Sequence, residues 1–139
     1  MANTIHVDIV SAEGQIFSGE ATRVFAPGSQ GELGIYPRHA PLLTTLTAGE
    51  VRVETEGQEE QSFFVGGGAM EVQPHLVTVL ADTAVRAKDL DEAAALAAKQ
   101  RAEDAVRNRG DKVDIAEAQA ELIRALAQLR AIARLRKKR

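Results

Sequence analysis

Cysteine is absent from the 139 residues, and this excludes disulfide bonds and thiol chemistry. Its absence is typical of a protein from a reducing compartment. No apolar run approaches the roughly 18 residues needed to cross a bilayer. The opening, MANTIHVDIV, lacks the basic-then-apolar pattern of a signal peptide. We therefore expect a soluble protein that reaches a membrane only through a partner.

Sets of residues that carry catalysis or bind metals are also missing. The three histidines (His6, His39 and His75) lie far apart without ligand spacing, and no serine sits in a nucleophile elbow. No Gly-Lys-Ser/Thr follows Gly66-Gly67-Gly68, so we interpret these glycines as a hairpin corner and not as a phosphate loop. We expect a solvated hairpin tip at Glu54, Glu56, Glu59 and Glu60. The sequence predicts a protein that is not an enzyme and holds no metal or cofactor.

The composition changes abruptly near residue 87. Residues 1–86 are rich in β-branched residues, glycine and proline, whereas residues 88–139 contain one glycine, no proline and many alanines and leucines. The first part carries 11 acidic and 4 basic residues, and residues 87–139 carry 9 acidic and 13 basic residues. This division predicts two domains, residues 1–86 and 87–139, built as a β module with a helical appendage.

Short β-type segments recur at regular spacing through the first domain. Ile5, Val7 and Ile9 alternate with other residues, as in a half-buried strand. Further segments follow between turn signals at Gly14, Pro27-Gly28, Ala48-Gly49, Glu56-Gly57 and Pro74. Eight or more strands without helices between them predict an antiparallel β-sandwich or flattened barrel.

The second domain has the start and stop signals of two helices. Asp89 and Glu92 form a capping box, which predicts a helix from there to about Asn108. Residues 108–112 supply a turn, and a second cap at Asp114 predicts a helix that ends near Arg136. The short loop makes the two helices an antiparallel hairpin. The fold class is therefore α+β in two parts, an antiparallel β-sandwich followed by a C-terminal α-helical hairpin.

Alanine dominates the predicted packing faces of the hairpin. Such a seam buries little apolar area although its helix propensity is high. Two interpretations remain: an ordinary docked hairpin, or a movable arm with two arrangements of similar free energy. The expected facing stripes are Leu90, Ala94, Ala97, Ala98, Ala102 and Ala105 on the first helix, and Ile115, Ala118, Leu122, Ala125, Leu129 and Ile132 on the second.

The last 16 residues carry seven basic side chains and no acidic one. Some of these cations complement the helix C-terminus, and the excess indicates an acidic partner. Nucleic acid is one alternative, which makes the protein a nucleic-acid-binding sandwich with a basic arm. The acidic overall charge and the lack of aromatic residues in the arm argue against it.

Several ungapped motifs, spread over the whole chain, resemble the ε-subunit family of bacterial F-type ATP synthases, called δ in mitochondria. The most specific is GELGIYPRHAPLL at residues 31–43, in which Pro37 and Pro41 bracket a rigid loop. The others are IHVDIVSAEGQIFSGEA, GGGAMEVQPHLVTVLADTAVR and LDEAAALAAKQRAE. The resemblance implies a non-catalytic central-stalk subunit of a proton-translocating ATP synthase, peripheral at the cytoplasmic face of the bacterial inner membrane.

The resemblance also implies partners for each domain. The sandwich is expected to link the γ subunit to the membrane-embedded c-ring. The residues that match the family's c-ring contact are Ser29, Gly31 and Glu32. Those that match its γ contact are Ser11, His39 and Thr44. The arm is expected to inhibit ATP hydrolysis when it extends into the catalytic head of α and β subunits. There Arg124, Arg130, Arg134 and Arg136 are expected to face acidic loops.

One position departs from the family's ATP-binding motif in the first helix, Leu/Ile-Asp-x-x-Arg-Ala. Here Ala94 follows Leu90 and Asp91 where the arginine would stand. Alanine offers no guanidinium to a phosphate, so the sequence predicts weak or no ATP binding. The alternative function, a free-standing nucleotide-sensing module whose arm closes over ATP, is disfavoured for the same reason.

Overall fold

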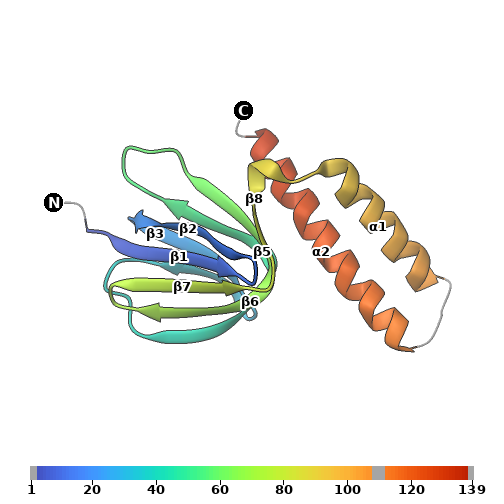
Figure 1. Cartoon of the computed structure of the whole chain (residues 1–139), viewed down its shortest axis with the longest axis horizontal. Coiled ribbons are helices and arrows are strands. Elements are labelled where there is room, and N and C mark those ends of the chain that lie inside the picture. Colours follow the sequence, from blue (N-terminus) through green and yellow to red (C-terminus); the bar gives the residue numbers. More distant parts are fainter. Residues whose placement is uncertain (1–2, 108–111, 138–139) are drawn as a thin grey trace. The chain divides into compact units, whose positions relative to one another are not determined.

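The computed structural model describes residues 3–107 and 112–137, with the backbone alone for residues 112–115. The chain divides into two compact units, Met1–Ala87 and Lys88–Arg139. The first unit contains every strand of the described residues, and the second contains the two long helices (Figure 1).

Eight strands make up the first unit. They are β1 (Ile5–Ser11), β2 (Gly14–Ala21), β3 (Arg23–Gly28), β4 (Gly31–Ile35), β5 (Leu42–Glu54), β6 (Gln61–Gln73), β7 (Leu76–Ala81) and β8 (Ala84–Arg86). Their hydrogen-bonded order is β2-β1-β7-β6-β5-β3-β4, and β8 also pairs with β6. The predicted sandwich is confirmed. Among the described strands, the one parallel pair is β1 with β7.

The two layers of the sandwich share β5 and β6, which are 13 residues long and bent. Residues 42–46 of β5 pair with residues 68–72 of β6, next to β7, β1 and β2; we call this side layer A. Residues 48–53 of β5 pair with residues 61–66 of β6, next to β3, β4 and β8; we call this side layer B. A single ladder thus folds over on itself and encloses a core.

The bend of β6 lies at its three glycines. Gly67 and Gly68 have φ angles of 109° and 132°, a region that side-chain-bearing residues rarely adopt. A Cβ on Gly68 would lie 2.1 Å from the carbonyl oxygen of Leu80. The prediction of a hairpin corner between two strands was wrong, because β6 runs through the bend without interruption. Ala48-Gly49 likewise lies inside β5 and not in a turn.

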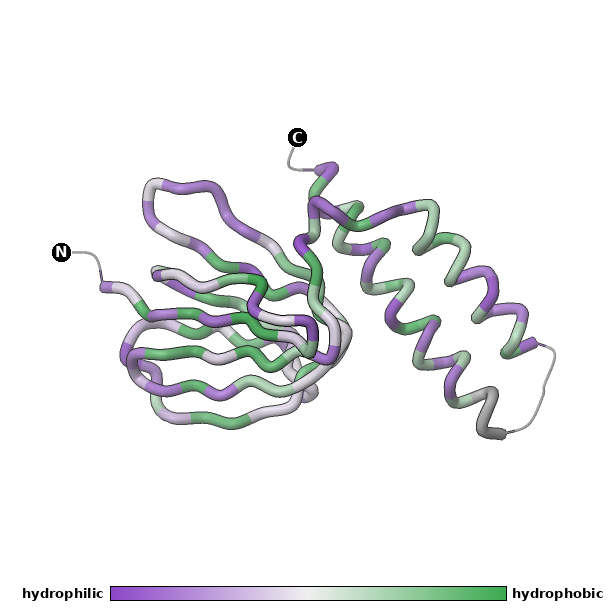
Figure 2. The backbone as a smooth tube through the Cα atoms, in the orientation of Figure 1, coloured by the Kyte–Doolittle hydropathy of each residue, from purple (hydrophilic) through white to green (hydrophobic). Residues whose placement is uncertain are grey.

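Alternate residues of the strands fill the space between the layers. Ile5, Val7 and Ile9 of β1 are fully buried, and so are Val51 of β5 and Val77 of β7. Hydrophobic and hydrophilic positions alternate along most of β1 and along the second half of β5 (Figure 2). The period of two that was read in the sequence therefore corresponds to inward and outward side chains.

The second unit is the predicted helical hairpin. A short 3₁₀ helix, η1 (Ala87–Asp89), precedes α1 (Glu92–Arg107), and α2 (Lys112–Lys137) follows. The backbone N–H of Ala94 donates to Oδ1 of Asp91 at 3.2 Å, so Asp91 caps α1. The prediction of Asp89 as the cap was wrong, because η1 occupies that residue. Most of the expected turn and the side chain of Asp114 lie outside the described residues.

The two helices pack through small side chains. Ala95 and Ala102 of α1 and Ala118 and Ala125 of α2 are buried. The predicted stripe of α2 is confirmed at Ala118 and Ala125. The predicted stripe of α1 is confirmed at Ala102 and wrong at Ala94, Ala97 and Ala105, which are exposed, and the buried Ala95 was not predicted. With alanine on every side of α1, hydrophobic periodicity does not distinguish one face from another. No helix of the described residues is long and apolar enough for a membrane span.

Candidate functional site

The turn between β3 and β4 brings the three expected c-ring residues together. Gly28 pairs with Gly31 across a two-residue turn, and Gly31 has a φ of 130°. Ser29, Gly31 and Glu32 are all exposed at this tip. The arrangement is a small polar hairpin tip that presents one carboxylate.

Contacts with β5 fix this tip on the sandwich. The backbone N–H of Ser29 donates to the carbonyl oxygen of Thr45 at 3.0 Å, and Oγ1 of Thr45 donates to Oγ of Ser29 at 2.8 Å. The carboxylate of Glu32 forms an ion pair with Arg52 of β5. The tip is therefore held to the neighbouring strand by backbone and side-chain bonds, and its residues have defined positions.

The loop after β4 carries His39. The N–H of His39 donates to the carbonyl oxygen of Tyr36 at 3.1 Å, and Nδ1 of His39 lies 2.7 Å from the carbonyl oxygen of Ala40. The N–H of Arg38, at a φ of 66°, donates to the carbonyl oxygen of Pro74 at 2.9 Å. These bonds hold the loop backbone against itself and against Pro74, and the two prolines fix the φ angle at two of its positions.

The three residues expected to contact γ come from separate elements. Ser11 ends β1, where its Oγ accepts from the N–H of Glu13 at 3.3 Å. Thr44 lies in β5 opposite the buried Met70, so its side chain is on the inner side of layer A and half-buried. His39 belongs to the loop that precedes β5. The structure does not gather the three into one cluster; they are spread around layer A.

Two exposed leucines on the outer side of layer A were missed by the sequence reasoning. Leu43 is 74% exposed, and Leu80 is 53% exposed. Leu80 lies opposite Val10 of β1 and Ala69 of β6, so the three share a row on the outer surface. Large apolar side chains that are exposed together on one face indicate a surface that binds another protein. The signal was present in the sequence, because both leucines break the alternation of their strands.

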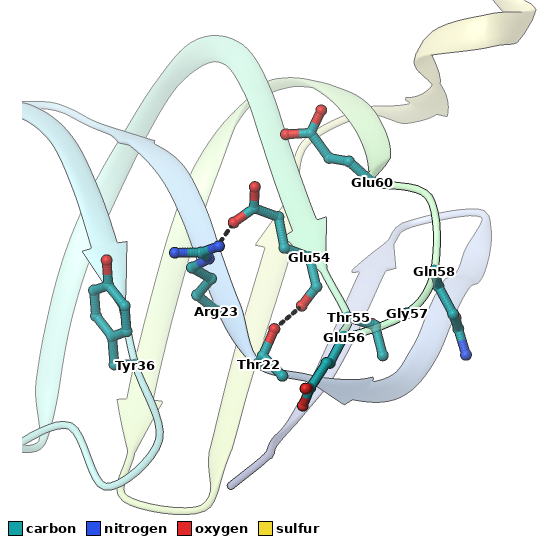
Figure 3. Close-up of a pocket in the computed structure, with 9 residues that line it drawn as sticks. All are labelled: Thr22, Arg23, Tyr36, Glu54, Thr55, Glu56, Gly57, Gln58 and Glu60. Atoms are coloured by element: carbon teal, nitrogen blue, oxygen red, sulfur yellow. Dashed lines mark hydrogen bonds and ion pairs between the residues drawn. The ribbon is translucent and has the colours of Figure 1, made fainter. Parts of the chain in front are cut away.

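Layer B carries a polar hollow of about 500 Å³ near the β5–β6 turn (Figure 3). In it Nε of Arg23 lies 2.5 Å from the carboxylate of Glu54, and Thr22 donates to the carbonyl oxygen of Glu54 at 2.9 Å. The expected solvated tip is partly wrong, because Glu54 and Glu60 are half-buried. No cluster of metal-ligating residues occurs among the described side chains.

The arm presents its arginines unequally. Arg124 and Arg130 are exposed, and Arg134 is half-buried. Nη1 of Arg136 lies 3.2 Å from Oε1 of Glu92, so this ion pair joins the end of α2 to the start of α1. The side chains of Arg136 and Glu92 are 63% and 37% exposed, so the pair contributes little to stability.

A family model described as the ATP synthase delta/epsilon chain β-sandwich domain matches residues 4–87. A second, described as the long α-helix domain of the same chain, matches residues 88–136. The chain belongs to the ATP synthase delta/epsilon family. The two models meet where the compact units of the structure divide.

Similar curated proteins share nearly the full length of the chain. It is 63% identical over 138 residues to the ATP synthase epsilon chain of Nitrosococcus oceani, and the match covers 99% of each chain. It is 60% identical over 139 residues to epsilon chain 1 of Methylococcus capsulatus, with 100% of this chain and 99% of that one covered. The chain is therefore a non-catalytic central-stalk subunit, and the expectation that it is no enzyme is confirmed by this membership.

Solved structures show the same fold at low identity. A chain in the mitochondrial ATP synthase of Euglena gracilis superposes with a TM-score of 0.85 at 18% identity, and the match covers 94% of this chain and 82% of that one. In the mitochondrial ATP synthase of Tetrahymena thermophila, a chain of the central stalk and c-ring structure gives a TM-score of 0.67 at 12% identity, with 92% and 96% covered. The sandwich with a helical hairpin thus recurs in distant ATP synthases.

Proposed function

We propose that the chain couples the γ subunit to the c-ring of a bacterial ATP synthase and restrains ATP hydrolysis through its helical unit. The sandwich serves as the rotor anchor, and the hairpin serves as the regulatory arm. The observation that carries the proposal is the family match over both units, together with the polar tip at which Ser29, Gly31 and Glu32 converge. The chain reaches the cytoplasmic face of the membrane only through this complex.

The c-ring contact is assigned to the β3–β4 tip. A short polar loop held to its neighbouring strand suits a rigid contact with another polar loop. Its single carboxylate is suited to a cationic or hydrogen-bond-donating partner on the ring. The exposed position of all three residues leaves them accessible to such a partner.

The γ contact is assigned to layer A and its margins, around Ser11, His39 and Thr44. The exposed side chains of Leu43 and Leu80 support the assignment to layer A, because both lie on its outer face, where Leu80 is opposite Val10, the neighbour of Ser11 in β1. The side chain of Thr44 points to the inner side and is not part of that outer face. A face with apolar side chains within a polar border is typical of a protein–protein interface.

The helical unit is assigned to inhibition. In the extended arm, Arg124, Arg130, Arg134 and Arg136 face acidic loops of the β subunits and part of γ. Two features support an arm that changes its contacts. The helices pack through alanines and so bury little apolar area, and the exposed ion pair of Arg136 with Glu92 is weak enough to exchange for another carboxylate.

The test removes residues 88–139 and measures assembly and ATPase rate. We expect the shortened chain to assemble with γ and the c-ring, because the anchoring residues all lie in the sandwich. Hydrolysis is expected to be faster, because the inhibitory arm is gone. A second variant keeps the full length and replaces the four arginines with glutamine. It is expected to raise the hydrolysis rate as well, because the arm is present but lacks the cations that contact the acidic loops. Loss of assembly would assign the helical unit a structural role instead.

A further inference from the structure

Arg52, a residue that the proposed c-ring contact does not include, is the centre of a polar cluster on layer B. Its guanidinium lies 4.6 Å from the centroid of the Phe25 ring and forms an ion pair with Glu32. Its Nη1 also lies 3.9 Å from Oε1 of Glu60. One arginine in β5 therefore contacts residues of β3 and β4 and of the segment before β6.

The strand register explains this geometry. Phe25 of β3 lies between Arg52 of β5 and Gly34 of β4. A Cβ on Gly34 would lie 3.3 Å from Cε1 of Phe25, so the glycine leaves room for the ring to lie across β4. The ring then supports the guanidinium, whose edge reaches Glu32, two residues from Gly34. Three adjacent strands thereby fix the direction in which Arg52 points.

The side chains of Arg52 and Glu32 differ in exposure, and this difference suits Arg52 to positioning Glu32. The side chain of Arg52 is 25% exposed, whereas that of Glu32 is 56% exposed. The cation is thus held in the surface of the sandwich, and the carboxylate it pairs with stands in solvent. The contact uses Oε1 of Glu32. A carboxylate offers about four acceptor positions, so this contact leaves others for a donor on a partner.

We propose that Arg52 is a positioning residue for Glu32, and this inference rests on the proposed c-ring contact. A glutamate side chain on a hairpin tip samples several rotamers, and each must be given up when a partner is bound. The ion pair with Arg52 holds the Glu32 carboxylate in one direction before the c-ring binds. Arg52 thereby strengthens binding to the c-ring without contacting the c-ring itself.

A purely stabilising role for Arg52 is the competing explanation, and the chain offers a matched control for it. Arg23 and Glu54 form an ion pair between β3 and β5, the strands that also carry Phe25 and Arg52. Arg23→Met removes that pair without touching Glu32. If Arg52 only stabilised the sandwich, Arg52→Met and Arg23→Met would have the same effect on ring binding.

The experiment uses the full-length chain bound to γ and titrates it with detergent-solubilised c-ring. We expect Glu32→Gln and Arg52→Met each to weaken binding about fivefold, the upper range for an ion pair with an exposed partner. The double variant is expected to bind no more weakly than either single variant, because both remove the same contact. Arg52→Lys keeps the charge but loses the planar guanidinium that lies over Phe25, so it is expected to recover only part of the affinity. Arg23→Met is expected to bind normally.

The outcomes separate this inference from the proposed function. Wild-type binding by Arg52→Met, with weakened binding by Glu32→Gln, would overturn the role of Arg52 and leave the ring contact in place. Additive losses in the double variant would also overturn it, because Arg52 would then act independently of Glu32. Wild-type binding by Glu32→Gln would remove the ring contact itself. If Arg52→Met does not fold, Arg52→Lys takes its place in the double variant, since additive losses from Arg52→Lys and Glu32→Gln would contradict the inference.

Discussion

At the residue scale, the sandwich depends on glycines whose positions differ in how much room they leave. Gly14 and Gly68 have almost the same φ, 130° and 132°. No heavy atom lies within 4 Å of a Cβ built on Gly14, whereas the Leu80 oxygen would lie 2.1 Å from one on Gly68. The two positions therefore separate backbone strain from steric overlap.

We predict that Gly68→Ala lowers the free energy of unfolding by about 3 kcal/mol or more, because strain and overlap add at the bend of β6. Gly14→Ala is expected to cost about 1–2 kcal/mol, from strain alone. Chemical denaturation of the two variants measures the difference. Equal losses would show that the bend of β6 tolerates a side chain and that overlap is not its constraint.

The missing arginine in the first helix leads to a prediction about ATP. Ala94 is exposed near the start of α1, and its N–H is bonded to Asp91. We expect no micromolar ATP binding by the isolated chain, because alanine provides no guanidinium for the phosphates. Calorimetric titration measures this, with Ala94→Arg as the comparison that restores the motif. Micromolar affinity in the unaltered chain would contradict the prediction.

At the element scale, α1 begins where a side chain supplies the missing hydrogen bond. We predict that Asp91→Ala destabilises the helical unit by about 1 kcal/mol, the usual loss for an N-cap. Asp89→Ala is the matched control and is expected to change stability by less than about 0.5 kcal/mol, because Asp89 is exposed in η1. Thermal unfolding followed by far-ultraviolet circular dichroism compares them. A larger loss of stability in Asp89→Ala than in Asp91→Ala would show that Asp89 is the N-cap residue of α1.

At the scale of the whole molecule, the two units differ in what holds them together. The core cluster runs from Ile5 to Ala81 and belongs entirely to the sandwich. In the helical unit the buried residues of the hairpin seam are alanines. Each buried alanine contributes far less than a buried leucine or phenylalanine. The sandwich therefore has a hydrophobic core of its own, whereas the described part of the hairpin has only a thin line of buried alanines between its two helices.

We predict that residues 1–87 fold alone and unfold cooperatively on heating, because their core is complete without the helices. Residues 88–139 are expected to be helical but to melt gradually, since intrinsic propensity and not burial holds them. Calorimetry of the two fragments tests this. A broad, heatless transition in the sandwich fragment would mean that its core depends on the helical unit.

Much of the fold followed from the sequence, because its signals are local. The alternation of Ile5, Val7 and Ile9 gave an inward face, and the loss of proline and glycine after residue 87 gave helices. The family resemblance placed the c-ring candidates in contiguous residues, and the β3–β4 turn brings Ser29 and Glu32 together. The resemblance to the ATP synthase family could be recognised from the sequence, because its motifs are contiguous stretches that occur in the same order as in the family.

Tertiary structure decided what depends on residues distant in sequence. The three glycines mark the bend of β6 in the sequence, but only the pairing with β7 and with β3 shows that β5 and β6 each continue into both layers. Contact with α2 decided that Ala95 is buried and that Ala94, Ala97 and Ala105 are exposed, because alanine on all sides of α1 leaves periodicity uninformative. The contact of Arg52 with Glu32 joins residues 20 positions apart, and only the register of three strands places them within reach.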